Sequence, residues 1–469
     1  LTTISEAKLR SETKLEYCPQ INKNFFLKKK ITYKDINNFS IEIKNQRKFE
    51  TNILLAKQFT KNNKNFFSTN NNLEILKKKF NAKIKIYFKN SVYCSFEGTV
   101  RLHGGYIADH INGQNISLRV DLKNSHILNS TKFSLILFSN RKFYNELFVS
   151  DFMRYLDFIV PLNFLTKVSL NGNNQYQVIF QDKDIVNILN YNKRKNGPIF
   201  ADNKRSHDKR RPLFRVKLEK NLINQKRYSL DEILSSLDKL NYLYLDNFSK
   251  DSIDKLFPKD FNNFKKISLF YSLLVSLDSI HGLGPGDKRF YYDEDLNLFE
   301  PILYNPESRI LENLDQKNKF KLSNLYEGEI FLVKDNLEYA IEIVKEIDPI
   351  KFYQTNELNR YNLSPDDISK VINRVIRNLK QLQNTSFPVK EPIDTYSIFR
   401  ENNNNYKLAF HEINNIFLIC DYTLNLCQKR KLNDNQINRL ISNQISNINN
   451  SKLRFIRKNK NNYKNGMIN

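Results

Sequence analysis

The sequence contains no tryptophan and only two methionines, whereas asparagine, lysine and isoleucine are abundant. AT-rich codons produce this bias, so part of the composition reflects the genome rather than the protein. Carbohydrate-cleaving enzymes use paired carboxylates, and Asp278, Asp287 and Glu300 lie in one region of the chain. The clefts of such enzymes usually also carry tryptophan platforms, so the missing tryptophan counts against this class.

Cysteine is scarce as well, and the four residues, Cys18, Cys94, Cys420 and Cys427, form no C-x-x-C pair. The last two are seven residues apart on an expected helix, too far for an easy bridge. We interpret all four as buried thiols, which leaves the redox compartment undetermined.

Long apolar runs are also missing, because no stretch reaches the 18 apolar residues that a membrane-spanning helix requires. The sequence begins with Leu1 rather than methionine, which leaves open whether a signal peptide precedes it. The location of the protein, cytoplasmic or exported to the cell envelope, is therefore undetermined. Its oligomeric state is undetermined too.

Several catalytic and binding motifs do not occur. The chain has no G-x-S-x-G elbow of a serine hydrolase and no pair of histidines at zinc-binding spacing near His281. Its net charge of +25 suits an acidic partner. However, lysine is the default surface residue of such a composition, and no recognition helix, zinc finger or RNA-binding aromatic motif is present. Nucleic acid is therefore not the favoured partner.

What is present is a strand-rich first half. Residues 1–81 alternate weakly and predict a strand-rich extension. Residues 82–182 contain short runs of alternating β-branched and aromatic residues, which predict an antiparallel sheet. Helical spacing over 143–161 predicts one inserted helix that ends at Pro161, and residues 171–174 are typical of a hairpin turn.

Helical patterns dominate after Lys183. A strand-rich half followed by a helix-rich half predicts an α+β, two-lobed protein-kinase-like fold, with an antiparallel β-rich N-terminal lobe and a helical C-terminal lobe. We therefore divide the chain into an extension (1–81), an N-terminal lobe (82–182), a C-terminal lobe (183–350) and a helical extension with a polar tail (351–469). The expected helices are 229–248, 264–280, 336–350, 365–384 and 406–431.

The most informative segment is 276–308, within the expected C-terminal lobe. An apolar helix leads to Asp278 and His281, a Gly/Pro turn carries Asp287, and two strands lead to Asn305. A helix end, a loop and a hairpin in this order can gather three oxygen-bearing side chains. Phosphoryl transfer uses such a set, with one carboxylate to orient a hydroxyl group and two oxygen ligands for Mg²⁺. The alternative interpretation is a surface loop followed by an ordinary hairpin.

A second candidate lies at residues 101–124, where a strand runs into Gly104 and Gly105 and a later strand carries Arg119 and Lys123. Glycines in such a turn let backbone N–H groups approach phosphate oxygens, and a basic side chain can neutralise them. An ordinary turn beside a solvated strand is the alternative.

Taken together, these motifs resemble the CotH kinase family, the atypical kinases related to spore coat protein H. The resemblance covers about residues 100–310 in unbroken order. It is carried by VRLHGG (100–105), ISLRVDLKN (116–124), TKFSLILF (131–138), RKFYNELFVSDFMRYLDF (141–158), VSLNGNNQYQVIFQDKD (168–184), LDSIHGLGPGDKRFYYD (277–293) and LFEPILYN (298–305).

The resemblance implies transfer of the γ-phosphoryl group of ATP to a hydroxyl group of a protein or another acceptor, with Mg²⁺ or Mn²⁺. It places Asp278 and His281 in the catalytic segment and makes Asp278 the residue that orients the hydroxyl. It makes Asp287 and Asn305 the metal ligands. The nucleotide would be held by Gly104, Gly105, Arg119, Lys123 and Gln181.

Three of these positions depart from the family pattern. Asp287 stands where an asparagine ligand is usual, Asn305 where a second aspartate belongs, and Gln181 where a glutamate is common. Loss of a metal-binding carboxylate lowers transition-state stabilisation. The alternative function is therefore an inactive or weakly active pseudokinase, which acts as a scaffold that binds nucleotide or protein.

Overall fold

The computed structural model describes residues 32–62, 76–89, 93–104, 107–202, 216–218, 236, 240, 253, 262–284, 287–312, 320, 325, 327–356, 358–385, 408–413, 416–421 and 426–431. The chain divides into a first unit, 1–150 with 161–194, and a second unit, 151–160 with 195–469. Within the described ranges no helix has the length and apolar character needed to cross a membrane, as expected from the sequence.

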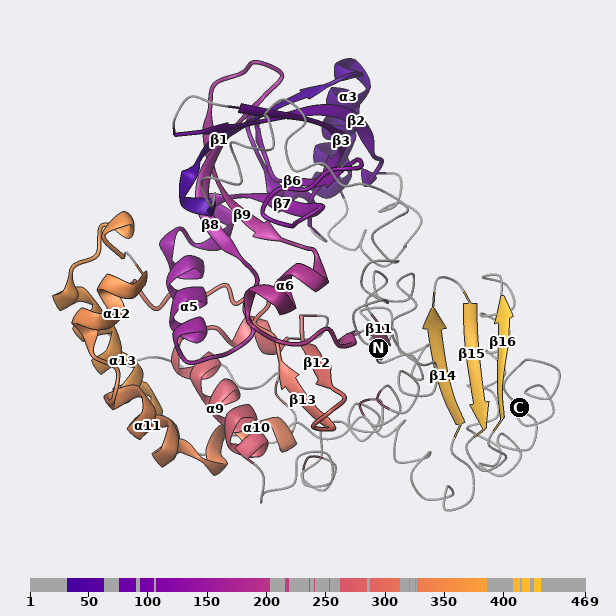
Figure 1. Cartoon of the computed structure of the whole chain (residues 1–469). Coiled ribbons are helices and arrows are strands. Elements are labelled where there is room, and N and C mark those ends of the chain that lie inside the picture. The colour runs from indigo at the N-terminus through magenta and orange to yellow at the C-terminus, as the bar shows by residue number, and fades with distance from the viewer. Residues whose placement is uncertain are drawn as a thin grey trace, which may run out of the picture. The chain divides into compact units, whose positions relative to one another are not determined.

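The first unit is built on a closed seven-stranded barrel with the strand order β1-β2-β3-β6-β7-β9-β8 (Figure 1). Strand β1 pairs antiparallel with β2 and parallel with β8, and this double pairing closes the sheet. Alternate residues face an interior filled with aliphatic and phenylalanine side chains such as Phe39, Phe133 and Phe180. The strands are β1 (Ile36–Ile43), β2 (Phe80–Phe88), β3 (Tyr93–Leu102), β6 (Leu118–Leu122), β7 (Lys132–Leu137), β8 (Asn163–Leu170) and β9 (Tyr176–Asp182).

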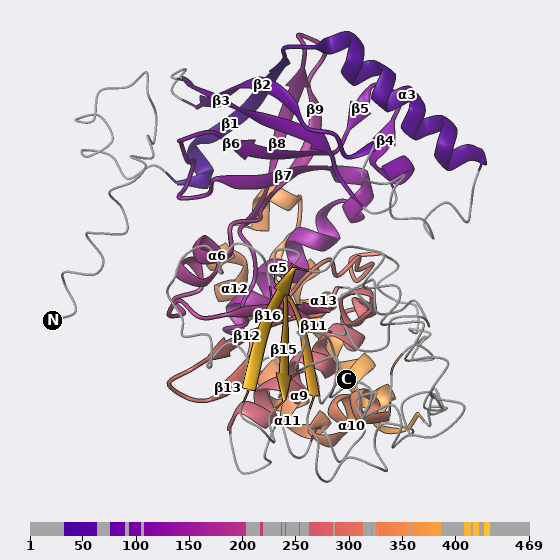
Figure 2. The same cartoon turned by 90° about the vertical axis from the view of Figure 1, so that its right-hand side faces the viewer.

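Two further elements complete the first unit. Helix α3 (Gln46–Asn62) lies beside the short pair β4 (Ile111–Asn112) and β5 (Asn115–Ile116), as Figure 2 shows. The ammonium group of Lys57 donates a hydrogen bond to the carbonyl of Gly113, at 3.1 Å, and so ties the helix to the β4–β5 turn. Short helix α6 (Ile185–Tyr191) follows β9.

The barrel overturns the predicted fold class. The two-lobed kinase-like fold, with an antiparallel β-rich N-terminal lobe, is wrong because the sheet is a closed barrel of mixed strand direction. The closing strand β1 comes from the weakly alternating segment before residue 82, which the sequence pattern assigned to an extension. Individual predictions for the sheet region are confirmed, namely the strands, the inserted helix α5 (Tyr144–Tyr155) and the hairpin that turns at Gly172, whose φ is +80°.

A buried carboxyl group at the end of β9 makes the stability of the barrel depend on pH. Asp182 is fully buried and accepts hydrogen bonds from Ser130 Oγ (2.7 Å), the Asp184 N–H (2.8 Å) and the Asn187 amide. Burial dominates over these hydrogen bonds and raises the pKa of Asp182 from 3.8 to about 7.

We therefore expect the free energy of unfolding to fall as pH rises from about 4 to 7, because the Asp182 carboxyl group loses its proton at a lower pH in the unfolded chain than in the folded one. The contribution of Asp182 is at most about 4 kcal/mol. Urea unfolding at pH 5 and pH 7.5 measures it, and Asp182→Asn should flatten the difference between the two. Glu97→Gln, at an exposed carboxylate, is the matched control and should leave the difference unchanged. Equal pH dependence in wild type and Asp182→Asn would contradict the assignment.

The second unit combines a four-stranded sheet with helices (Figure 1). The sheet has the order β11-β10-β12-β13, and β12 pairs antiparallel with both β10 and β13. Its elements are β10 (Ile199–Asp202), β11 (Val216–Leu218), α9 (Asn262–Ser276), β12 (Arg289–Asp293), β13 (Leu298–Pro301), α10 (Glu327–Asp335), α11 (Leu337–Lys345), α12 (Pro349–Asn356) and α13 (Pro365–Gln383).

Helix α13 is the longest described helix of this unit, and its start is encoded locally. Ser364 and Asp367 form a capping box, in which Ser364 Oγ accepts from the Asp367 N–H at 3.2 Å. Pro365 occupies the first turn, where its missing N–H costs nothing. The predicted helices 264–280, 336–350 and 365–384 are thus confirmed apart from their ends. Only residues 236 and 240 of the predicted helix 229–248 are described, so that helix stays a prediction.

The predicted helix over 406–431 is wrong. This segment forms an antiparallel three-stranded sheet of β14 (Leu408–Ile413), β15 (Ile416–Asp421) and β16 (Leu426–Lys431). The register places Cys420 opposite Cys427, so the helical spacing assumed for these residues does not apply. Cys94, on β3, is disulfide-bonded rather than a free thiol. Pairing between distant cysteines leaves no spacing signal in a sequence.

Candidate functional site

The segment 276–308 folds into two adjoining stretches of chain in the second unit. Ser308 Oγ donates to the carbonyl of Leu277 at 2.6 Å, next to Asp278. A Cβ atom on Gly282 would lie 3.2 Å from the carbonyl oxygen of Tyr304, so the two backbones nearly touch there. The loop after α9 and the chain after β13 therefore lie against each other. The predicted convergence of the Asp278, Asp287 and Asn305 side chains stays a prediction.

Helix α13 holds both stretches from one side. Asn378 Nδ2 donates to the carbonyl of Ser276 at 2.7 Å, and Arg374 Nη1 donates to the carbonyl of Ile310 at 2.7 Å. Burial lowers the pKa of Arg374, and the nearby carboxylate of Asp278 acts in the opposite direction. Sequence reasoning assigned no role to this helix. The sequence feature that could have indicated such a role is an arginine and an asparagine at positions that helical spacing places on the buried, otherwise apolar face of this helix.

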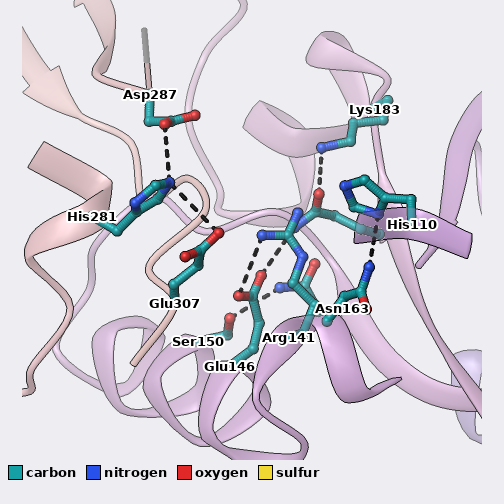
Figure 3. A network of polar contacts seen from close by, with 11 residues as sticks. His110, Arg141, Glu146, Ser150, Asn163, Lys183, His281, Asp287 and Glu307 are labelled. Atoms are coloured by element: carbon teal, nitrogen blue, oxygen red, sulfur yellow. Dashed lines mark hydrogen bonds and ion pairs between the residues drawn. The ribbon is translucent and has the colours of Figure 1, made fainter. Parts of the chain in front are cut away.

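An acid–histidine cluster occupies the middle of the segment, and we use this name for His281, Asp287 and Glu307. His281 Nε2 lies 3.4 Å from Asp287 Oδ2 and 3.6 Å from Glu307 Oε1. Figure 3 shows the imidazole between the two carboxylates. The side chain of Asp287 is 8% exposed, whereas that of His281 is 47% exposed and open to solvent. Glu307 is a member that the sequence motifs did not indicate.

Three residues of the same segment have a left-handed backbone conformation. Asp278, Asn305 and Glu307 have φ values of +54°, +51° and +48°. Left-handed conformations are uncommon outside glycine, although aspartate and asparagine tolerate them better than glutamate does. Such residues gather at functional loops, where surrounding structure holds them in place.

The neighbouring strand β12 orients the turn that carries Asp287. Arg289 Nη1 donates to the carbonyl of Asp287 at 2.8 Å, and its guanidinium lies 3.4 Å from the ring centroid of Tyr304. This stack joins the start of β12 to the chain after β13. Lys288 forms an ion pair with Glu329 of α10, and both side chains are buried. The contacts of Arg289 and Lys288 therefore hold the turn of Asp287 in place.

The predicted metal ligands have different surroundings. One oxygen of Asp287 faces His281, whereas Asn305 is half-buried and its side chain makes no hydrogen bond within the described residues. Among the residues that the structure describes, no three His, Cys, Asp or Glu side chains are arranged to hold one metal ion. A carboxylate and a free amide oxygen still suit Mg²⁺, which commonly takes few protein ligands and keeps water and phosphate oxygens.

The predicted nucleotide-binding residues lie in the first unit, where the sheet brings Arg119 and Gln181 onto one face. Arg119 pairs with Ser134, and Ser134 pairs with Gln181, on adjacent strands. Lys123 is exposed beyond the far end of β6, about 13 Å along the strand from Arg119. It is therefore separated from the other residues.

The glycine turn has a different local role from the predicted one. Gly104 has a φ of +92°, and a Cβ atom there would lie 2.0 Å from Cδ2 of His110. The absent side chain thus makes room for the imidazole of His110. Gly105 lies outside the described residues.

Comparison with known proteins adds no identification, because no family model matches the chain and no curated protein is significantly similar to it.

Proposed function

We propose that this protein is a metal-dependent phosphotransferase whose motifs resemble those of the CotH kinases, with residues 276–308 as its catalytic segment. The supporting observation is the contact between the loop of Asp278 and the chain after β13, made by Ser308 and Gly282. This contact places the chain positions of Asp278 and Asn305 on neighbouring stretches, as convergence of their side chains would require. The barrel fold does not argue against the activity, since one chemistry occurs on unrelated folds.

In this proposal Asp278 orients the acceptor hydroxyl group and accepts its proton. The left-handed backbone of Asp278 turns the chain away from α9, and α13 holds the turn through Asn378. Asp287 and Asn305 would hold Mg²⁺ or Mn²⁺, which neutralises developing charge on the phosphates when bound. His281, between two carboxylates, keeps the Asp287 side chain in a fixed orientation.

A non-catalytic scaffold that binds nucleotide is the second candidate, and two observations favour it. Asn305 supplies a neutral ligand where a carboxylate would bind the metal more strongly, and Asp287 already faces His281. This alternative predicts nucleotide binding without transfer.

Transfer is tested by incubating the full chain with γ-labelled ATP, Mg²⁺ or Mn²⁺, and either a casein-like substrate or the protein itself. We expect label in protein, and we expect Asn305→Asp to increase it because a second carboxylate strengthens the metal site. The matched control is Asn297→Asp, at a left-handed asparagine in the β12–β13 turn. No incorporation by wild type and none gained by Asn305→Asp would leave the scaffold as the better account.

A further inference from the structure

The four cysteines of the chain divide evenly between its two units. Cys18 and Cys94 belong to the first unit, and Cys420 and Cys427 belong to the second. Cys94 is disulfide-bonded, so a second cysteine is oxidised with it. Four cysteines can pair in three ways, and the sequence alone does not choose among them. Strand register favours one of the three.

The three-stranded sheet brings the two cysteines of the second unit to facing positions. Strands β15 and β16 are antiparallel neighbours (Figure 1), and Cys420 is the register partner of Cys427. Facing residues of an antiparallel pair share one face of the sheet and have Cα atoms about 4.5–5.5 Å apart. Disulfides span Cα separations of about 4.4–6.8 Å. The backbone therefore places these two cysteines within bridging distance.

Cys94 occupies the other unit. It lies on β3 opposite Ile86 of β2, and its side chain is fully buried in the barrel core. A bridge from Cys94 to the second unit would separate two cysteines that already face each other, and would leave Cys18 to bond the remaining one. Pairing of Cys420 with Cys427 instead leaves Cys18 as the partner of Cys94. Cys18 itself lies outside the described residues.

We propose that the chain carries two disulfides, Cys18–Cys94 and Cys420–Cys427, and that it folds in an oxidising compartment. Disulfides form and persist in such compartments, whereas cytosolic thiols are kept reduced. The full burial of Cys94 does not suit an exposed redox-sensing thiol, so its bridge is structural. This inference does not depend on phosphoryl transfer, because it follows from the cysteines alone.

Each bridge forms by exchange with the disulfide of a thiol–disulfide oxidase. A thiolate of the chain attacks the oxidant's disulfide and forms a mixed disulfide, and the oxidant's other sulfur leaves as a thiol. The second thiolate of the chain then attacks the mixed disulfide and releases the second thiol. The two protein thiols thereby lose two electrons and two protons, which reduce the oxidant to a dithiol.

The two bridges differ in the length of chain that they enclose. The loop closed by Cys18–Cys94 contains β1 and β2, and β1 is the strand that closes the barrel against β8. The loop closed by Cys420–Cys427 is only the β15–β16 turn. A disulfide restricts the unfolded chain, and this restriction grows with loop length. We therefore expect the bridge of Cys94 to contribute more to stability.

Mass spectrometry of the full chain, exported to a bacterial periplasm and alkylated in denaturant before digestion, tests the pairing. None of the four cysteines should be alkylated until a reductant is added. Trypsin should then release peptides 15–23 and 90–101 as one linked species. Trypsin leaves Cys420 and Cys427 on one peptide, 408–429, so a protease that cleaves before Asp421 is used to separate them. The two fragments should stay joined until they are reduced.

Production of the same chain in a reducing cytoplasm tests the compartment. We expect alkylation of all four cysteines and a melting temperature at least about 5 °C below that of the exported protein. Exported Cys18→Ala changes no residue of the barrel, yet it should reproduce most of this drop and leave Cys94 as its one alkylated residue. The double variant Cys420→Ala/Cys427→Ala is the matched control and should lower the melting temperature by about half as much.

Four results would overturn the proposal. The first is alkylation of Cys420 and Cys427 in the exported, unreduced protein. The second is a peptide that links Cys94 to either of them, and the third is a disulfide between two copies of the chain, visible as a dimer on a non-reducing gel. The fourth is an equal melting temperature for the reduced and the exported protein, because folding would then need no oxidant.

Discussion

Replacing Glu329 with alanine is expected to lower the free energy of unfolding by about 3–5 kcal/mol, because it leaves the Lys288 ammonium buried without its carboxylate. The side chains of the pair are 4% and 0% exposed, so solvent cannot replace the lost partner. The carboxylate also acts on Tyr271, whose pKa is raised well above 10, first by burial and then by Glu329. Urea unfolding at pH 7 measures the change.

The double variant Lys288→Met/Glu329→Leu is the control for charge. We expect it to recover most of the lost stability, because a buried ion pair and a well-packed apolar pair are often similar in free energy. Lys195→Met, which breaks an exposed ion pair with Asp295, should change stability by less than about 1 kcal/mol. A Glu329→Ala variant within 1 kcal/mol of wild type would show that Lys288 finds water or another partner.

Substitution of Asp278 with asparagine is expected to reduce phosphoryl transfer by about 10²–10⁴-fold, the usual contribution of a positioned general base. Asparagine tolerates the left-handed backbone of this position at least as well as aspartate does, so the turn after α9 should survive. The loss should therefore appear in kcat, with little change in the melting temperature. Initial rates with saturating ATP and metal measure it.

The control is Asp295→Asn, which removes an exposed carboxylate from the β12–β13 turn of the same unit. Transfer by this variant should match wild type. If Asp278→Asn retained full transfer while the wild-type enzyme was active, Asp278 would not be the base. Glu307, whose carboxylate lies beside His281, would then be the next residue to replace.

From the sequence, only the order of the candidate site residues along the chain could be predicted. The order of Asp278, Asp287 and Asn305 around a helix end, a turn and a hairpin predicted that their side chains converge. The structure shows that the two stretches carrying Asp278 and Asn305 are in contact, and convergence of the side chains stays a prediction. Glu307 was not predicted, because its carboxylate joins the cluster through a left-handed backbone that no sequence pattern encodes. The supporting contacts of α13 were not predicted either, since they join residues 64 and 102 positions apart in the chain.

For the fold too, features set by neighbouring residues were predicted, and features set by contacts between distant residues were not. The capping box at Ser364, the hairpin turn at Gly172 and most described strands follow from short-range patterns. The segment 408–431 was misassigned because apolar runs of this length suit either a helix or a set of strands. Tertiary pairing, here with the neighbouring strand, decides between them.

Local sequence patterns are sufficient to predict the strands of the sheet, the starts of the confirmed helices and the chemical types of residues 276–308, because each depends on neighbours a few residues away. Long-range strand pairing, in contrast, is what places β1 between β2 and β8 to close the barrel and aligns Arg101, Arg119, Ser134 and Gln181 in one row across the sheet. Strand order and register depend on contacts between distant segments, and the free energy of those contacts is not written in any local pattern.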